Sequence, residues 1–364
     1  RFYAIALVFY GHFIEEFMLL KIPAAAAQYR FIYSFHMVLF IVIAGYAAKV
    51  EEVDWNPGAF LKHRFFSRLL PFLFFTAVMM VPPVFFDGKF YGLVLPSVAG
   101  YTQGLLNTAF GLPSFCVPSW FLLLIIGVEI VHYCAYRVVR SSERRILLAA
   151  LAFYLTGYAL NLKLDIFNPL KGRTIGWNYF FIHEAITLYG FYLIGIWLRR
   201  RRFLINRPAA WMLVPSALGA FLVVLFTYAL NNGPFNFPPY QAVVILFASH
   251  GHILLFPLTA LAGGALVFLL ARLTPDMRPV NWLGGNTLIL MCLNGIFYHY
   301  INPPVARWAL AAFPASGMSV FVIGSLMTVA SLAACMPLVY LFNRWVPQLV
   351  GKPKRGGPLF KNWI

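Results

Sequence analysis

Arg1 and His12 flank ten mostly apolar residues, and their spacing could place two chemically useful side chains on one helix face. Eleven helical steps of about 100° amount to three turns plus roughly 20°, and the rise separates the two residues by about 16 Å, half of a bilayer core. An arginine at the rim of a membrane span with a histidine buried below it is costly, which favours a functional pair. The alternative is an arginine that reaches the interface and a histidine that packs in the core.

Glu15 and Glu16 follow His12 at positions i+3 and i+4, hence on the same side of the helix. A carboxylate beside an imidazole fixes its tautomer and raises its basicity, as general-base catalysis requires. His12 is therefore a candidate general base with Glu15 beside it. Because both glutamates lie near the end of the expected span, a solvated position at the outer interface is the alternative.

His36 is a second histidine inside an apolar run, expected near the outer boundary of the second span. A single membrane histidine is most often a hydrogen-bonded packing residue. Two histidines in adjacent spans favour one shared cavity, so His36 joins His12 as a candidate.

Arg64 and Arg68 are spaced i, i+4 at the entrance of the third span. Two guanidinium groups on one helix face make a good phosphate clamp, because each offers forked donors. Anchoring of the span at the membrane surface explains them as well, and the run Arg199–Arg202 is interpreted as such a topology signal.

The elements that must position these residues are membrane spans. Of the 364 residues, 61% are hydrophobic and only 11% are charged, which excludes a soluble domain and makes the bilayer the first partner. We expect an all-α integral membrane protein with a single domain over residues 1–345 and a basic cytoplasmic tail over 346–364. Ten apolar segments read as spans: about 2–20, 31–48, 69–86, 118–136, 146–160, 180–198, 209–230, 252–270, 282–301 and 317–342.

The first apolar run is expected to be a true span, since no small-residue cleavage site follows it, and a short segment is expected to precede Arg1. The net charge of +17 does not indicate nucleic acid, because the basic residues lie in short connections between spans. The connections after the second, fourth, sixth and eighth spans, with the tail, hold 20 of the 28 Lys and Arg residues, against 7 in the others. The positive-inside rule therefore predicts that both termini are cytoplasmic.

Two longer connections, 87–117 and 231–251, fall on the non-cytoplasmic side, and the first could form a lid or a re-entrant segment. The four scattered cysteines predict no disulfide, and no zinc motif, phosphate-binding glycine loop or nucleophile elbow occurs. His250 and His252 are two neighbouring histidines, which are too few to predict a metal site.

Five short motifs occur in order along nearly the whole chain. They are an R-x10-H pair (Arg1, His12), an F-H-M-x-L-F segment followed by G-Y (Ser34–Phe40, Ala44–Tyr46), an R-x3-R-hydrophobic-Pro segment (Arg64–Pro71), a W-F-L helix opening (Pro118–Leu122) and a late L-G-x-N-T-L segment (Leu283–Leu288). This ordered set resembles the acyltransferase-3 family of integral membrane O-acyltransferases, and the late segment is similar to its sugar O-acetylase branch.

Two positions depart from the family pattern. Val38 replaces the usual proline after the His-Met pair, a minor change. Asn294 stands where the late helix commonly carries a histidine. An amide can orient a neighbour or donate hydrogen bonds but cannot take a proton, and His299 lies about 140° round the helix from it, which makes it a poor substitute.

The resemblance implies transfer of an acyl group, usually acetyl, from cytoplasmic acyl-CoA to a hydroxyl of a glycan or glycolipid, in a multi-pass protein of the bacterial inner membrane. Acyl-CoA would be a substrate, with no permanently bound cofactor and no metal. Arg64 and Arg68, with Trp120, are expected to bind the donor. His12 would deprotonate the acceptor, Arg1 would hold the donor or stabilise developing charge, and His36 would complete the cavity.

Direct transfer and an acyl-histidine intermediate both stay open. Two other functions also stay open. One is a catalytically silent accessory subunit of a larger membrane complex, which the Asn294 departure favours. The other is a proton-coupled transporter that uses buried His and Glu residues as a relay.

Overall fold

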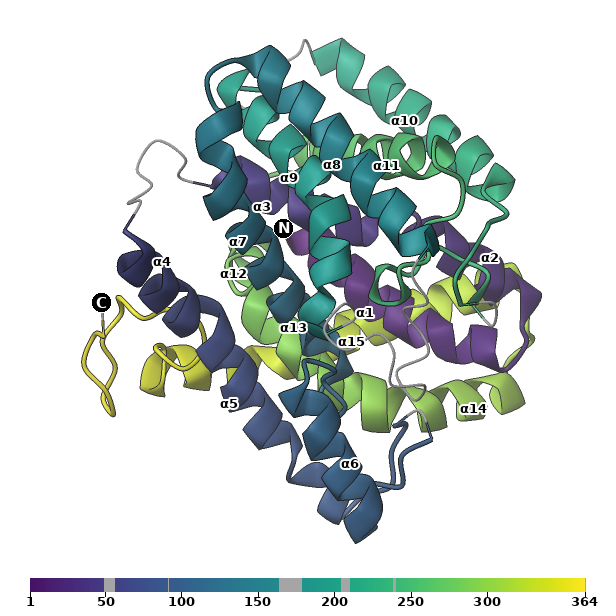
Figure 1. Ribbon diagram of the computed structural model, residues 1–364. Coiled ribbons are helices and arrows are strands. Elements are labelled where there is room, and N and C mark those ends of the chain that lie inside the picture. Colours follow the sequence, from purple (N-terminus) through teal and green to yellow (C-terminus); the bar gives the residue numbers. More distant parts are fainter. Residues whose placement is uncertain (49–55, 91, 164–178, 204–209, 238–239, 364) are drawn as a thin grey trace.

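The computed structural model of the protein describes residues 1–48, 56–90, 92–163, 179–203, 210–237 and 240–363. Within these ranges the chain is helical, with an isolated β-bridge between Val244 and Ser249 (Figure 1). The α-helices are α1 (Phe2–Leu19), α2 (Pro23–Tyr33), α3 (His36–Ala47), α4 (Pro57–Arg64), α5 (Leu70–Met79), α6 (Val98–Ala109), α7 (Trp120–Val139), α8 (Glu143–Lys163), α9 (Ile182–Arg200), α10 (Ala210–Leu230), α11 (Leu255–Leu273), α12 (Arg278–Gly284), α13 (Thr287–Ile296), α14 (Asn302–Ala312) and α15 (Gly317–Trp345).

The described residues contain 9 helices long and apolar enough to cross a membrane, or up to 10 when one bent pair is counted as a span. The expected all-α membrane architecture is thus confirmed. Of the basic residues that predicted the orientation, Lys49, Lys171, Arg173 and Arg207 lie outside the described residues.

The ninth expected span is broken rather than straight. The axis of α12 and that of the helix over residues 287–312 meet at 79°. Gly284 and Gly285 are poor helix formers, and the Asn286 amide donates to the carbonyl of Trp282 over 2.7 Å, which competes with continuation of the helix.

Two short π-helical segments occur within spans: η1 (Phe65–Leu69) between α4 and α5, and η8 (Phe297–Ile301) between α13 and α14, in the same bent ninth span. Such turns widen the helix locally and are often found at functional positions. The first carries Arg68, and the second carries Tyr298 and His299.

The helix that carries Arg1 and His12 lies in the middle of the bundle. Helix α1 packs against α2, α3, α13, α14 and α15 (Figure 1). Its buried residues point in all directions around the axis, from Ala4 to Phe17, as expected for a helix enclosed by others. Most side chains on α1 therefore face protein rather than lipid.

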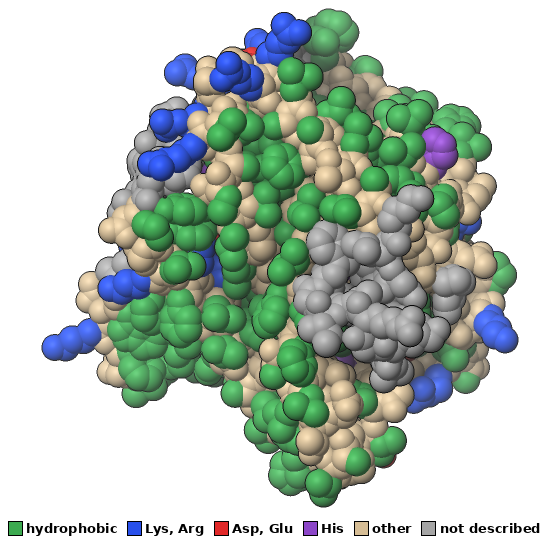
Figure 2. Space-filling view, in the orientation of Figure 1, with side chains coloured by type: hydrophobic (Ala, Val, Ile, Leu, Met, Phe, Trp, Pro, Cys, Tyr) green, Lys and Arg blue, Asp and Glu red, His purple; other side chains and the backbone are tan. Residues whose placement is uncertain are grey.

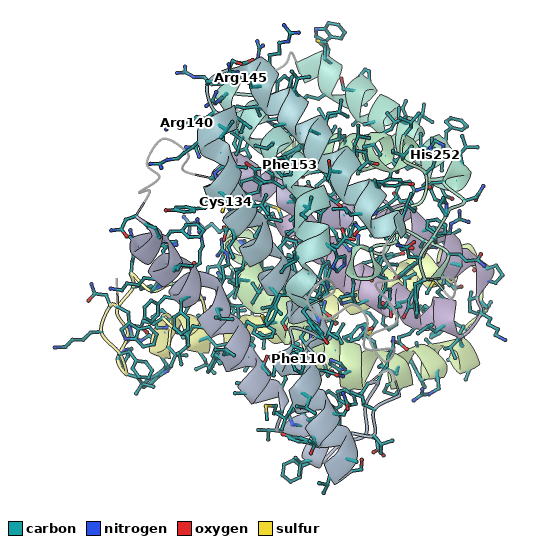
Figure 3. The ribbon with its side chains drawn as sticks, in the orientation of Figure 1. Phe110, Cys134, Arg140, Arg145, Phe153 and His252 are labelled. Carbon is teal, nitrogen blue, oxygen red and sulfur yellow. The ribbon has the colours of Figure 1, made fainter. Side chains whose placement is uncertain are left out.

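The outer surface matches a membrane protein. Figure 2 shows a broad apolar face, with many Lys and Arg side chains along its left and upper edges. Arg140 and Arg145, at the α7–α8 connection, lie toward this basic edge, whereas His252, before α11, lies at the opposite edge (Figure 3). Helix α10 exposes large apolar side chains such as Trp211 (75%) and Phe226 (65%), which suits contact with lipid tails.

Helices α3 and α9 approach closely through two glycines. A Cβ on Gly45 would lie 2.0 Å from the carbonyl oxygen of Tyr192, and one on Gly195 would lie 2.2 Å from that of Val42. Small residues permit such close contact between membrane helices. This contact fixes the frame from which His36 and the rest of α3 reach the interior.

We expect Gly45→Ala to destabilise the protein by about 1–3 kcal/mol, because the backbone of α9 cannot move aside without loss of packing. The measurement is the thermal unfolding midpoint of the protein purified in detergent. Gly219→Ala in α10 is the matched control, since no atom lies within 4 Å of its added Cβ. Equal midpoints for wild type and Gly45→Ala would contradict the prediction.

Candidate active site

His12 lines a small cavity of about 40 Å³, which has room for a few water molecules. The cavity lies where α1, α2, α3, the start of α7, the 240–247 loop and η8 meet. Its lining is mostly aromatic and polar: His12, Glu15, Tyr29, Tyr33, His36, Met37, Val117, Trp120, Tyr240, Val244, Ile245, Leu246, Phe247 and Tyr298. We call it the outer cavity, because the connections expected on the non-cytoplasmic side close it.

The orienting group of His12 is an amide. Its Nδ1 lies 3.1 Å from Oδ1 of Asn294, and its ring lies 4.9 Å from that of Tyr298. An amide oxygen accepts a hydrogen bond, so Nδ1 carries the proton and Nε2 is the basic nitrogen. Asn294, the departure from the family pattern, thus positions His12.

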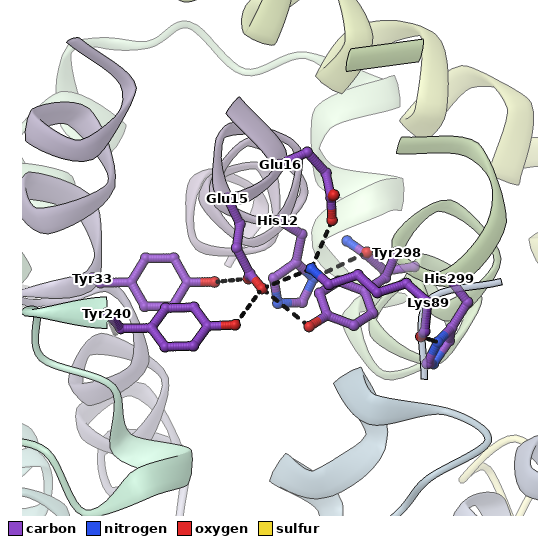
Figure 4. A network of polar contacts seen from close by, with 9 residues as sticks. His12, Glu15, Glu16, Tyr33, Lys89, Tyr240, Tyr298 and His299 are labelled. Atoms are coloured by element: carbon purple, nitrogen blue, oxygen red, sulfur yellow. Dashed lines mark hydrogen bonds and ion pairs between the residues drawn. The ribbon is translucent and has the colours of Figure 1, made fainter. Parts of the chain in front are cut away.

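Glu15 is buried and forms the centre of a polar network (Figure 4). Its carboxylate accepts hydrogen bonds from Tyr240 and Tyr298, each over 3.1 Å, and from Tyr33 over 3.4 Å, besides an ion pair with Lys89 at 3.0 Å. The solvated position considered for Glu15 is therefore not adopted. Burial, followed by the Glu15 carboxylate, raises the pKa of Tyr240, which keeps it a donor.

Lys89 brings the opposite charge from the connection between α5 and α6. Its ammonium lies 2.7 Å from Glu16 as well as 3.0 Å from Glu15. Burial alone would lower the pKa of Lys89, but the two carboxylates outweigh it and raise the pKa above its ordinary value. Both glutamates are thus buried and share one cation.

His299 holds the backbone of that connection in place. Its Nδ1 donates to the carbonyl of Lys89 over 2.7 Å, and its Nε2 accepts from the amide of Val117 over 3.2 Å. Phe90 stacks on the imidazole at 4.7 Å. Residues near both ends of the 87–117 connection are in this way tied to η8, and His299 contributes support rather than replacing a family histidine.

His36 lies beside His12 on the outer cavity, at the first turn of α3. Its Nδ1 donates to the carbonyl of Ile32 over 3.1 Å, and its ring meets Tyr33 edge to face at 4.5 Å. The break between α2 and α3 at Ser34 and Phe35 gives His36 this position. The two histidines expected to share a cavity are thus brought together.

A second, much larger cavity of about 1060 Å³ opens at the other end of α1. We call it the basic cavity. Arg1, Arg64 and Arg68, expected to act together, all line it. Lys352 and Lys354 from the tail line it too, and among the described residues Glu129 is the one carboxylate in the lining.

Glu129 lies between the two arginines of the third span. Its Oε1 is 3.3 Å from Arg64 and 3.5 Å from Arg68, and the carboxylate is nearly buried. Its Oε2 and the Nε of Arg64 have no hydrogen-bond partner among the described atoms. The clamp is therefore assembled around an internal anion and keeps unused donor capacity.

The two cavities approach each other inside the bundle. On α3, Met37 lines the outer cavity and Phe40 the basic one, and on α7 the same holds for Trp120 and Phe121. One helical turn is about 5.4 Å, so a thin layer of apolar side chains divides the cavities. Trp120 lies at this layer, on the side of His12 rather than beside the arginines.

Several of these residues were not anticipated. Glu129 could have been predicted from the sequence, since a carboxylate inside an expected span marks a functional position. Lys89 was visible as the lone basic residue of the 87–117 connection. The partners Tyr33, Tyr240 and Tyr298 could not be found from spacing, because they come from three distant segments.

Replacing Lys89 by methionine leaves two buried carboxylates without their cation, so we expect Lys89→Met to destabilise the protein by about 3–5 kcal/mol. Adding Glu16→Gln should recover part of the loss in thermal unfolding measurements. Because the pKa of Lys89 is raised above 10.5, its stabilisation is complete below pH 10.5 and disappears only as the pH rises through the higher folded value. The unpaired carboxylates of the variant take up protons as the pH falls, so the deficit should be larger at about pH 9 than at about pH 6. A deficit that is no larger at the higher pH would contradict the assignment.

A comparison with protein-family models gives a match. Residues 1–340 match the acyltransferase-3 family model, described as an acyltransferase domain. Searches of curated proteins and of solved structures returned no match. The family match covers most of the chain, from the Arg1 and His12 pair to α15. The chain therefore belongs to the acyltransferase-3 family of membrane acyltransferases.

Proposed function

We propose that the protein is a membrane O-acyltransferase that moves an acyl group, in the simplest case acetyl, from cytoplasmic acyl-CoA to a hydroxyl of a glycan or glycolipid. The observation that carries the proposal is the pair of cavities: one is basic, the other contains a positioned histidine, and only a thin apolar layer divides them.

The basic cavity suits the nucleotide part of the donor. CoA carries several phosphates, and forked guanidinium groups bind phosphate oxygens well. Arg1, Arg64 and Arg68 supply such groups, and the cavity is large enough for a nucleotide. The positive-inside rule puts this cavity on the cytoplasmic side, where acyl-CoA is found.

The outer cavity suits the acceptor. Its volume of about 40 Å³ has room for the reacting hydroxyl and its carbon but not for a whole sugar ring, so the rest of the acceptor would lie toward the surface. An acceptor presented at the non-cytoplasmic surface, such as a lipid-linked sugar of the bacterial inner membrane, would enter past the 87–117 and 231–251 connections. A sugar acceptor agrees with the late motif of the sugar O-acetylase branch.

In the transfer step, the acceptor oxygen attacks the thioester carbonyl carbon, a C–O bond forms and the C–S bond breaks. His12 Nε2 takes the hydroxyl proton and returns it to the departing thiolate. Asn294 holds the imidazole in the required tautomer, and Trp120 at the dividing layer contacts the acyl arm. His36 completes the acceptor side.

The test is release of free CoA thiol from acetyl-CoA by the protein in detergent, with water or supplied sugars as acceptor. We expect His12→Ala to lower the rate by about 10²–10⁴-fold, since that is what a positioned general base contributes, with CoA affinity unchanged. His252→Ala, a histidine that lines neither cavity, is the matched control and should retain full activity.

Full activity of His12→Ala would overturn the assignment of the base. A wild-type protein that binds no CoA but co-purifies with a larger membrane complex would indicate the accessory function instead. A response to a pH gradient without acyl-CoA in vesicles would indicate the transporter, whereas thiol release in detergent needs no gradient.

A further inference from the structure

The C-terminal tail folds back against the basic cavity rather than extending from it. Gln348 is fully buried, and its amide donates to the carbonyls of Phe360 over 2.7 Å and Lys361 over 3.0 Å. The ring of Trp363 lies 5.5 Å from that of Phe66, near the start of η1. The tail is thus an ordered element, although the family match ends at residue 340.

A turn at Gly351 packs the tail against the spans that form the cavity. Its φ is +85°, a conformation that favours glycine. A Cβ there would lie 3.0 Å from Leu288 and 3.2 Å from the carbonyl oxygen of Ser67, next to Arg68. This approach brings Lys352 and Lys354 to the cavity lining.

Lys352 is held by neutral groups. Its ammonium donates to Oδ1 of Asn286, over 2.7 Å, and to Oδ1 of Asn343. Asn343 in turn donates to Asn286 over 2.8 Å, which fixes both amides. An ammonium has three donors, so one remains for a ligand. Burial, and then Arg355, lower the pKa of Lys352, as expected where neutral amides take the place of a carboxylate.

The charge in the cavity is unbalanced. Among the described residues, five cationic side chains line it, against the single carboxylate of Glu129, which Arg64 and Arg68 already share: Arg1, Arg64, Arg68, Lys352 and Lys354. Such a set is self-repelling unless it binds an anion with several charges. A lone phosphate would leave part of it unmatched.

We propose that the tail forms one wall of the donor site, with Lys352 and Lys354 binding phosphates of the CoA nucleotide while Arg64 and Arg68 bind others. This inference rests on the proposed function. It assigns binding residues to a segment that lies beyond the family match, and it makes Asn286 and Asn343 positioning residues that act through Lys352.

The experiment is calorimetric titration of CoA, and of CoA that lacks its 3′-phosphate, into the detergent-purified protein. We expect Lys354→Ala and Lys352→Met each to weaken CoA binding roughly tenfold, as for loss of one charge-assisted contact. If one of the two lysines binds the 3′-phosphate, its variant should lose less affinity for the ligand without this phosphate than for CoA. Lys361→Ala, an exposed tail lysine outside the cavity lining, is the control and should bind as wild type.

The possible outcomes distinguish this inference from the proposed function on which it rests. Wild-type affinity in both lysine variants, with weakened binding in Arg64→Ala and Arg68→Ala, would overturn the role of the tail and leave the donor site in place. Wild-type affinity in all four variants, or no CoA binding by the wild-type protein, would overturn the proposed donor site as well. Lys354 is exposed, so its variant should fold normally, and thermal unfolding checks this.

Discussion

A carboxylate inside a membrane protein must be compensated by a cation and hydrogen-bond donors, and Glu15 sets this requirement for the whole outer half of the bundle. Lys89 and three tyrosine hydroxyls meet it, from segments far apart in the sequence. The connections that carry Lys89 and Tyr240 are therefore held over α1. The same arrangement encloses His12 in a small polar cavity.

Charge is compensated differently at the two ends of α1. At the outer end, acids and bases are paired inside the protein, and the cavity is small. At the basic end, cations outnumber carboxylates among the described residues around a large cavity. The outer site thus has a carboxylate in excess of its cation, whereas the basic site has cations in excess that a bound anion would offset. The two ends of α1 therefore differ in charge along the membrane normal.

The sequence was sufficient for features that depend on local periodicity. Helix spacing and basic-residue distribution single out Arg1, His12, Arg64 and Arg68, and in the structure the three arginines line the basic cavity while His12 lines the outer one. Contacts between distant segments could not be predicted. The Asn294 amide beside His12 depends on a helix 282 positions away, and the bend at Gly285 and the π turn of η8 alter the angles that a regular helix would give.

The position of Glu129 bears on how fast a bound anion can leave. An anion held by Arg64 and Arg68 must share them with a carboxylate that is already in place. When the anion departs, Glu129 still offsets one of the two guanidinium charges, so the empty clamp is less self-repelling than two bare arginines would be. Part of the binding affinity for an anion is thereby given up, and the anion is released faster.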